Sequence, residues 1–266
     1  MLKDNNNSNN SNSNNSKVAI VTGASSGIGY ATSLALSKAG IRVAAGARRM
    51  NRLQELQEEI VKNCNAQERR GEDIFIQKRL DVTNKSDCDT FVDTIVRKWG
   101  RVDILVNNAG LMPLSYFKNC KIKEWEQMID VNIKGVLYCT SAVIPYMIDK
   151  KSGHIINLSS VAGRIVFAGG SIYCATKHAI TAFSEGLRKE LSPEHNIRVT
   201  CVEPGAVATE LLETITDESM TKFVEGSKNM ERLQSEDIAN AILYAIQAPS
   251  HVNVNEMLIR PTTQER

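Results

Sequence analysis

The chain has 266 residues, of which 42% are hydrophobic and 23% charged, enough for one large α/β domain with a buried core. Its 32 basic and 30 acidic side chains leave a net charge of +2 and form no block of like charge, which argues against a nucleic-acid or membrane-surface partner. No continuous apolar run approaches the roughly 20 residues needed to span a bilayer.

Six cysteines are scattered along the chain without a C-x-x-C pair, and the four histidines are scattered too. We therefore expect reduced, buried thiols, a cytoplasmic location and no metal site. Residues 1–16, MLKDNNNSNNSNSNNS, are almost all Asn and Ser and offer no apolar surface to offset the entropy of ordering. They are predicted to form a disordered tail, followed by a single domain over residues 17–266.

From Lys17 onward, short apolar runs alternate with amphipathic helical segments. Strands are predicted at residues 18–21, 41–45, 74–80, 102–106, 154–158, 197–202 and 254–259. Helices are predicted at residues 27–39, 51–64, 86–99, 123–147, 172–191 and 236–247, with Ser86 as the N-cap of the third. This alternation predicts an α/β fold with a doubly wound (Rossmann), mostly parallel sheet and helices on both faces.

The two least regular segments, residues 111–121 and 206–229, both follow predicted strands. Because the carboxyl ends of parallel strands meet at one edge of the sheet, we expect both segments at that edge, where ligands bind in this architecture.

A glycine-rich loop joins the first predicted strand to the first helix. It has the spacing G-x-x-x-G-x-G and lacks the Lys-Ser/Thr of a Walker loop. Glycines here permit a tight turn and a close approach of a pyrophosphate, and the helix N-terminus directs free N–H groups at the phosphates. The residues expected to bind a dinucleotide here are Gly23, Ala24, Ser25, Ser26, Gly27, Ile28 and Gly29.

Two arginines, Arg48 and Arg49, follow the second strand, where an NAD-binding domain commonly has an acidic residue. Guanidinium groups grip a 2′-phosphate with bidentate, charge-assisted hydrogen bonds. The alternative is a pair of solvated arginines at the start of a helix, where the helix dipole disfavours cations. The sequence therefore predicts NADP(H) rather than NAD(H).

Two further strand ends carry residues suited to a dinucleotide. Asp81 ends the third strand and can reach an adenine amino group, although it fits a cap or turn equally well. The run N-N-A-G ends the fourth strand, where small and amide side chains leave room for a cofactor, the alternative being a simple turn. The predicted cofactor contacts at these ends are Asp81, Val82, Asn108, Ala109 and Gly110.

A Tyr-Lys pair opens the helix predicted after the fifth strand. Tyr173 and Lys177 are four residues apart and share a helix face, and the serines that end the preceding strand can fold back toward them. A phenol, an ammonium and a hydroxyl that converge form an acid–base site for a carbonyl or an alcohol. A lone Y-x-x-x-K is more often a pair of surface residues, so the rest of the sequence has to decide.

The motifs occur in order and at consistent spacing: T-G-x-x-x-G-x-G, D-V, N-N-A-G, the Asn of V-N-I-K-G, S-x12-Y-x3-K and E-P-G. Together they resemble the short-chain dehydrogenase/reductase family, from about residue 17 to the end of the chain. The segments AGARRMNRLQEL, VNNAGLMPLS, GHIINLSSVAG and IRVTCVEPGAVATEL further resemble its NADP-dependent 3-hydroxy acid (serine/allo-threonine-type) dehydrogenases.

The resemblance implies a catalytic set. Tyr173 would be the acid/base, and Lys177 would hold the nicotinamide ribose and lower the Tyr173 pKa. A serine would bond the substrate oxygen, and Asn132 would complete a proton relay through water. Family spacing places this serine thirteen residues before Tyr173, which selects Ser160, and alternation along the strand sends Ser159 to the opposite side.

The resemblance also implies the surroundings of the site. Residues 206–229 would form a mobile lid over the substrate, and the chain would assemble as a homodimer or homotetramer. The loop expected to wrap the nicotinamide contributes Pro204, Gly205, Val207 and Thr209.

The predicted substrate pocket is mostly apolar, with one guanidinium. Arg164 either pairs with a substrate carboxylate or is a solvated loop residue, so the substrate-binding set is Ser160, Arg164 and Tyr173. The other lining residues are Leu111, Met112, Pro113, Leu114, Ile165, Val166 and Phe167.

The subgroup resemblance implies an oxidoreductase for a 3-hydroxy acid such as serine or 3-hydroxypropionate. The apolar rim leaves room for a bulkier ketone or aldehyde of steroid or retinoid type. The alternative of another class is a catalytically silent, NADP-sensing protein, which would not need Asn132, Ser160, Tyr173 and Lys177 together.

Overall fold

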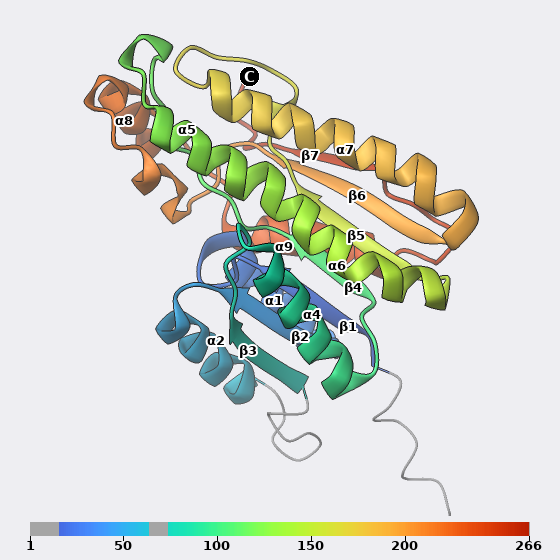
Figure 1. Cartoon of the computed structure of the whole chain (residues 1–266). Helices are drawn as coiled ribbons and strands as arrows, with labels where there is room; N and C mark the ends of the chain where they lie inside the picture. Colours follow the sequence, from blue (N-terminus) through green and yellow to red (C-terminus); the bar gives the residue numbers. More distant parts are fainter. Residues whose placement is uncertain (1–15, 64–73, 266) are drawn as a thin grey trace, which may run out of the picture.

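The computed structural model describes residues 16–63 and 74–265 (Figure 1). Within this part of the chain, a seven-stranded sheet has the order β3-β2-β1-β4-β5-β6-β7, and every neighbouring pair is parallel. The strands are β1 (Val18–Thr22), β2 (Arg42–Ala47), β3 (Phe75–Arg79), β4 (Ile104–Asn107), β5 (Gly153–Leu158), β6 (Ile197–Pro204) and β7 (Glu256–Ile259). Strand order reverses between β1 and β4, so a crevice for a ligand is expected at their carboxyl ends.

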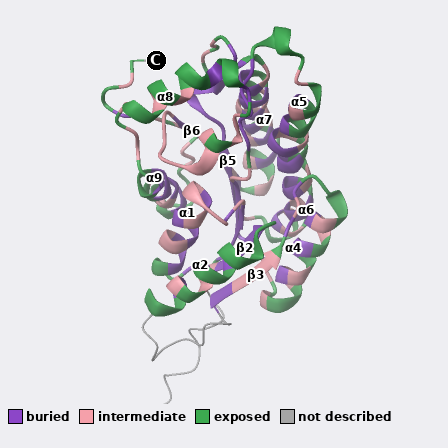
Figure 2. Ribbon diagram, turned by 90° about the vertical axis from the view of Figure 1, so that its left-hand side faces the viewer, coloured by how far each residue is buried: buried purple, intermediate pink, exposed green. Residues whose placement is uncertain are grey.

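Helices cover both faces of the sheet. They are α1 (Gly27–Lys38), α2 (Met50–Asn63), α4 (Lys85–Trp99), α5 (Ile122–Ile129), α6 (Gly135–Lys150), α7 (Ser171–His195), α8 (Thr221–Asn229) and α9 (Ser235–Gln247). One apolar cluster packs α4, α6 and α7 against the sheet, and a second packs α1, α2 and α9 against its other face. Figure 2 shows this buried layer between the two sets of helices. The predicted doubly wound fold is confirmed.

Burial explains why the inner strands read as continuous apolar runs. All five residues of β1 are buried, whereas β3 and β7 at the sheet edges are only partly covered. The imperfect apolar alternation of the third predicted strand therefore reflects its edge position.

The cap predicted for the third helix is wrong by two residues. Asn84 is the N-cap of α4, and its Oδ1 accepts hydrogen bonds from the backbone N–H groups of Ser86 and Asp87, at 2.9 and 3.2 Å. Asn and Ser are equally good caps, so composition alone did not distinguish them.

The long helix predicted at residues 123–147 is interrupted. A π-helical turn, Asp130–Lys134, separates α5 from α6, and Asn132 lies in it. Pro145 is accommodated inside α6, which continues to Lys150. By length and composition, the combined helix Ile122–Lys150 could cross a membrane, and half of its most apolar stretch is buried inside the fold.

The two irregular segments lie against each other. The Met112 N–H donates to Thr214 Oγ1 at 3.0 Å, and Asn119 Nδ2 donates to Asp217 at 2.6 Å. The segment predicted as a lid is more regular than expected, because it contains two short 3-10 turns, Glu210–Thr214 and Glu218–Met220, before α8.

Five of the six cysteines lie in the described residues, and all five are free. Cys88, Cys139, Cys174 and Cys201 are buried as predicted, whereas Cys120 is exposed. Cys64 and the predicted tail, apart from Ser16, lie outside the described residues.

Candidate active site

Tyr173 and Lys177 lie in the first two turns of α7, where the helix meets the carboxyl edge of the sheet. Both side chains are buried, with exposed fractions of 5% and 8%. Lys177 Nζ lies 5.7 Å from the centre of the Tyr173 ring and donates a hydrogen bond of 2.8 Å to the carbonyl of Leu158, at the end of β5. The pair is therefore an enclosed site and not two surface residues.

The adjacent serines point to different partners. The Ser160 hydroxyl has two acceptors for its single proton, the Tyr173 phenol oxygen and the Pro204 carbonyl at 3.3 Å. The Ser159 hydroxyl instead donates to the Lys177 carbonyl at 2.9 Å and lies 3.0 Å from Thr181 Oγ1. The structure thus brings Ser160, and not Ser159, to the phenol.

Asn132 reaches the same place from the π-helical turn. Its amide exchanges two hydrogen bonds of 3.0 Å with the backbone of Leu111, and its Nδ2 also donates to Thr176 Oγ1 at 3.2 Å. A methyl group added at Gly110 would lie 3.4 Å from Asn132 Oδ1 and 3.9 Å from Lys177 Nζ. Both distances are ordinary van der Waals contacts, so Gly110 lies beside both Asn132 and Lys177.

Burial dominates the electrostatics of the pair. It raises the pKa of Tyr173 to about 12, and the hydrogen bond from Ser160 opposes this rise. Burial also lowers the pKa of Lys177 to about 8. The expected lowering of the Tyr173 pKa by Lys177 is not seen, because the ammonium faces the Leu158 carbonyl and both groups have lost their hydration.

The glycine-rich loop is held against the end of β4. Gly23 has φ +64° and packs so closely that an added Cβ would lie 2.8 Å from the Ala109 Cα. The Asn108 amide donates to the carbonyls of Thr22 and Gly23, at 3.0 and 3.2 Å, and Thr22 Oγ1 accepts from the backbone N–H groups of Asn108 and Ala109. The N-N-A-G run is thus a turn that fixes the shape of the loop, and Ile28 follows in the first turn of α1.

Arg49 forms a polar cluster with the same loop. Its guanidinium donates to the hydroxyls of Ser25, at 3.1 and 3.2 Å, and Ser26, at 2.8 Å, and it pairs with Glu210 at 2.8 Å. Arg48, next to it, is exposed. Guanidinium and hydroxyl donors at the carboxyl end of β2 are a set suited to a phosphate group.

Asp81 and Val82 follow β3 at the same sheet edge. Asp81 Oδ1 accepts from the backbone and the hydroxyl of Thr83, at 3.1 and 2.8 Å, so the carboxylate does form a turn. Its pKa is lowered, because the Thr83 bonds and the positive charge of Arg48 outweigh burial. Val82 is buried and packs against Gly135.

The loop after β6 lies across the glycine-rich loop. The Gly205 N–H donates to the Ile259 carbonyl at 2.7 Å, and a Cβ added at Gly27 would lie 3.0 Å from Thr209 Cγ2. Val207 pairs with Leu233 in an isolated bridge. A pocket of about 650 Å³ opens beside this crossing, and its walls include Ser26, Gly27, Tyr30, Thr209, Glu210 and Ser235.

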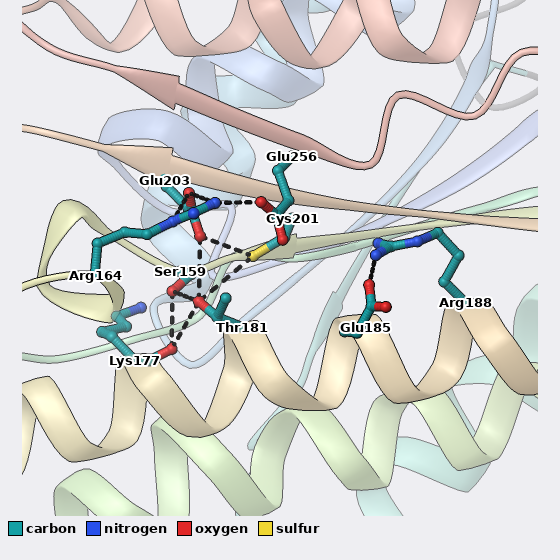
Figure 3. Close-up of polar contacts among 9 residues, drawn as sticks. All are labelled: Ser159, Arg164, Lys177, Thr181, Glu185, Arg188, Cys201, Glu203 and Glu256. Carbon is teal, nitrogen blue, oxygen red and sulfur yellow. Dashed lines mark hydrogen bonds and ion pairs between the residues drawn. The ribbon is translucent and has the colours of Figure 1, made fainter.

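Arg164 is held by two carboxylates of the chain itself. Its guanidinium donates to the carboxylate of Glu203 at 2.8 Å and also pairs with Glu256 of β7 (Figure 3). Because two carboxylates already hold the group, a substrate contact is not needed to explain its position. Glu203 was not singled out as a functional candidate, although its place at the end of a buried strand was a signal for a paired acid.

Among the described residues, no group of three His, Cys, Asp or Glu side chains is arranged to hold a metal ion. What the site offers is a buried phenol, hydroxyl, ammonium and amide next to a glycine-rich loop and a guanidinium cluster. Such a set can exchange a proton with a bound oxygen atom while a dinucleotide lies along the sheet edge.

Relatives of the chain have names consistent with this chemistry. An uncharacterized oxidoreductase of Staphylococcus saprophyticus is 47% identical over 250 residues, which cover 93% of this chain and 97% of the relative. The glycine betaine reductase of Emericella nidulans is 41% identical over 246 residues, which cover 92% of this chain but only 19% of that protein.

Solved structures with a similar fold also carry names of dehydrogenases. The closed form of a serine dehydrogenase complexed with NADP+ has a TM-score of 0.84 and 35% identity, covering 94% of this chain and 96% of that one. The Escherichia coli serine dehydrogenase has a TM-score of 0.77 and 33% identity, covering 94% of this chain and all of that one. The family model described as short chain dehydrogenase matches residues 17–220. The chain is therefore an oxidoreductase that belongs to the short-chain dehydrogenase family.

Proposed function

We propose that this oxidoreductase uses NADP(H) to interconvert an alcohol and a carbonyl, with a 3-hydroxy acid such as serine or 3-hydroxypropionate as the first candidate substrate. The observation that carries the proposal is the buried contact between Ser160 and Tyr173, one helical turn from Lys177. The similarity to serine dehydrogenases supports the substrate class.

The chain's own side chains account for the proton chemistry. Ser160 holds the substrate oxygen beside the phenol, and Tyr173 donates a proton to that oxygen during reduction or accepts it during oxidation. Lys177, when protonated, offers donors to a ribose hydroxyl, and Ser160 rather than Lys177 opposes the rise in the Tyr173 pKa. Asn132 holds the Leu111 backbone and the Thr176 hydroxyl in place and, as the family resemblance implies, contributes to a proton relay through water. The bound nicotinamide supplies or accepts the hydride.

Arg48 and Arg49 support NADP(H) rather than NAD(H). Arg49 is already fixed by the hydroxyls of Ser25 and Ser26, so a 2′-phosphate would meet an oriented guanidinium together with hydroxyl donors. Replacing both arginines by Ala should raise the Michaelis constant for NADPH at least tenfold and leave that for NADH nearly unchanged. An unchanged constant for NADPH would contradict the assignment.

A bulkier ketone or aldehyde is the second candidate, because most of the loop residues predicted to line the substrate site are apolar and Arg164 is held by carboxylates. Leu111, Met112 and Leu114 are buried around the site, and Phe167 stacks on Phe223 of α8 with ring centres 5.6 Å apart. A hydrophobic substrate would extend this apolar packing without needing a cationic partner.

A substrate panel tests the proposal. NADPH oxidation would be followed with 3-oxo acids, aliphatic ketones and aldehydes, and NADP+ reduction with serine and 3-hydroxypropionate, using Tyr173→Phe as the inactive control. Turnover that is fastest with the acids supports the first candidate, and turnover only with bulky ketones supports the second. Tight NADPH binding without turnover of any carbonyl would favour a silent sensor.

We also propose that the enzyme is a cytoplasmic homo-oligomer. Half-exposed apolar side chains on the outer surface of α5 and α6, Ile129 at 39% and Leu137 at 38%, support self-association. Light scattering of the purified chain coupled to size exclusion would give the oligomeric state directly.

A further inference from the structure

Glu203 is a buried carboxylate immediately before the Pro204-Gly205 turn, and its side chain is fully enclosed. A charge in such a place is tolerated only if other groups compensate it. Arg164 does so through Nε and Nη2, both 2.8 Å from Glu203 Oε2. The other oxygen, Oε1, accepts from Thr181 Oγ1 at 3.3 Å. The carboxylate therefore joins the loop after β5 to helix α7.

The same contacts continue to the catalytic side chains. Thr181 Oγ1 lies 3.0 Å from Ser159 Oγ and 3.2 Å from the Lys177 carbonyl, so its single proton bonds either Glu203 or that carbonyl, and Ser159 Oγ donates to the same carbonyl at 2.9 Å. Figure 3 shows this network, which runs from Glu256 through Arg164 and Glu203 to Thr181, Ser159 and the backbone of Lys177. The network ends at Ser159, the residue before Ser160, and at the backbone carbonyl of Lys177, whose side chain carries the ammonium group of the site.

Arg164 is also tied directly to the turn that carries Ser160. Ser160 is the N-cap of the short 3-10 turn Val161–Gly163, and its Oγ accepts from the Ala162 N–H at 3.1 Å. The Arg164 N–H closes the turn by donating to the Val161 carbonyl at 2.9 Å. The turn is tightly packed at Gly163, because an added Cβ would lie 2.5 Å from Ser159 Oγ and 2.7 Å from Thr181 Oγ1.

We infer that Arg164 and Glu203 are positioning residues that hold the turn of Ser160 against Tyr173, so that Arg164 acts on catalysis without touching the substrate. This inference rests on the proposed role of Ser160 and Tyr173. The inference gives Glu203, the buried acid of the E-P-G motif, a part in the reaction. From the end of β6, its carboxylate helps to fix the position of the Ser160 hydroxyl, which follows β5. The exposed partner, Glu256, makes a smaller contribution, since water competes for its ion pair.

Positioning and substrate binding give different kinetic signatures. Loss of a substrate anchor raises the Michaelis constant for acidic substrates alone, whereas a displaced Ser160 lowers turnover with every carbonyl. The Ser160 bond also opposes the rise in the Tyr173 pKa that burial causes. A displaced Ser160 should therefore move the rise of alcohol oxidation with pH to higher pH, which a loss of stability alone would not do.

The test compares Arg164→Met, Arg164→Lys, Glu256→Gln and Ser160→Ala with a matched control, Arg188→Met. Arg188 pairs with Glu185 farther along α7, outside the network (Figure 3). We expect Arg164→Met to lower kcat about 10- to 100-fold with all carbonyls and to leave the KM for NADPH within about twofold. The rise of alcohol oxidation with pH should move to higher pH, as it does in Ser160→Ala. Arg164→Lys should recover part of the loss, Glu256→Gln should have a small effect, and Arg188→Met should leave the pH profile unchanged.

A double variant sharpens the test. If Arg164 acts through Ser160, adding Arg164→Met to Ser160→Ala should lower kcat little further. Two results would overturn the inference: a wild-type kcat and pH profile in Arg164→Met, or a raised KM confined to acidic substrates. If Arg164→Met does not fold, Arg164→Met with Glu203→Gln removes both charges together and is read in the same way.

The inference can also fail separately from the proposed function. If the wild-type chain reduced no carbonyl, the function would be wrong, yet an ultraviolet titration of the Tyr173 phenol, with Tyr173→Phe as the blank, would still be informative. If the pKa of the Tyr173 phenol rises in Arg164→Met as it does in Ser160→Ala, the positioning role is supported. An unchanged pKa in Arg164→Met contradicts it.

Discussion

At the scale of single residues, enclosure sets the chemistry of the site. Tyr173 and Lys177 are both shifted toward their uncharged forms, with pKa values of about 12 and about 8, because water is excluded from both. Ser160 is the group that acts against this shift on the phenol. A small movement of one hydroxyl can therefore change the protonation of the acid/base.

The Ser160 contact leads to a direct comparison of the two serines. Ser160→Ala should lower kcat about 100-fold, because a group that bonds the reacting oxygen is lost, while Ser159→Ala should lower it less than tenfold. Steady-state kinetics with the best carbonyl of the panel measures both. The reverse order would mean that the strand presents Ser159 to the substrate.

The pKa of Lys177 leads to a stability prediction. Between about pH 8 and pH 10.5 the folded chain holds fewer protons at Lys177 than the unfolded chain, so its contribution to the free energy of unfolding rises with pH across this range. Relative to Lys177→Met, the wild-type chain should gain up to about 3 kcal/mol over this window. Urea unfolding of both proteins at several pH values measures the difference, and a constant difference would contradict the shift.

The sequence singled out residues that the structure brings together, but it did not predict their pKa shifts. Ser160 could be separated from Ser159 because spacing and strand alternation agree. The direction of the Tyr173 pKa could not be predicted, since it depends on how deeply β5 and α7 enclose the phenol. The partners of Arg164 were missed for the same reason, because Glu203 and Glu256 are 39 and 92 positions away in the chain.

At the scale of elements, most helices and strands follow from the alternation of apolar runs, and the exceptions have local causes. The helical apolar pattern continues from α5 into α6, so nothing in it signals the π-helical turn at Asp130–Lys134. Such turns are frequent at functional sites, and here the turn places Asn132 beside Gly110. Helix α8 was missed because it has no fully buried residue.

The segment after β6 is linked to the glycine-rich loop by a charged contact. Glu210, in the first 3-10 turn of that segment, pairs with Arg49 at 2.8 Å and lies 3.7 Å from Arg52. Burial works against ionisation of Glu210, but the bonds from Arg49 and Ser26 hold its pKa below the usual value. A 2′-phosphate on Arg49 would have to compete with this carboxylate.

Removing the carboxylate should therefore favour the phosphorylated cofactor. We expect Glu210→Gln to tighten NADPH binding about two- to fivefold and to leave NADH binding unchanged, as measured by fluorescence titration. Glu213→Gln, on the wall of the same pocket, is the matched control. Equal effects of the two variants, or equal effects on the two cofactors, would argue against competition.

At the scale of the whole molecule, the sheet gathers every candidate residue at one edge. The order of β1, β4, β5 and β6 brings the glycine-rich loop, the N-N-A-G turn, Ser160 and the E-P-G turn next to one another. This arrangement was predictable, because a parallel sheet has only one carboxyl edge. The contacts between residues 111–121 and 206–229 were not, because neither segment has a periodic pattern that fixes its partner.

Lys17, near the start of the described residues, already bonds the sheet, because its carbonyl accepts from the Arg42 N–H at 2.9 Å. A chain that lacks residues 1–15 should therefore keep its kcat within about twofold and its melting temperature within about 2 °C. Thermal unfolding and steady-state kinetics check this. A chain that lacks residues 1–20 would lose three of the five residues of β1 and should not fold, so similar behaviour of the two truncations would contradict the assignment of β1.

The residues around β7 give the order of synthesis a role in forming this site. The Gly205 N–H bonds Ile259, the Ala206 N–H bonds Gln264, and Glu256 pairs with Arg164. These partners leave the ribosome long after Tyr173 and Lys177 have done so. The early strands and helices can assemble while the chain grows, but the loop beside the dinucleotide and the turn of Ser160 gain these supports only after β7 and the residues that follow it have been made. Cofactor binding should therefore wait for the synthesis of β7, and nascent chains that stop before β7 should emerge without bound cofactor.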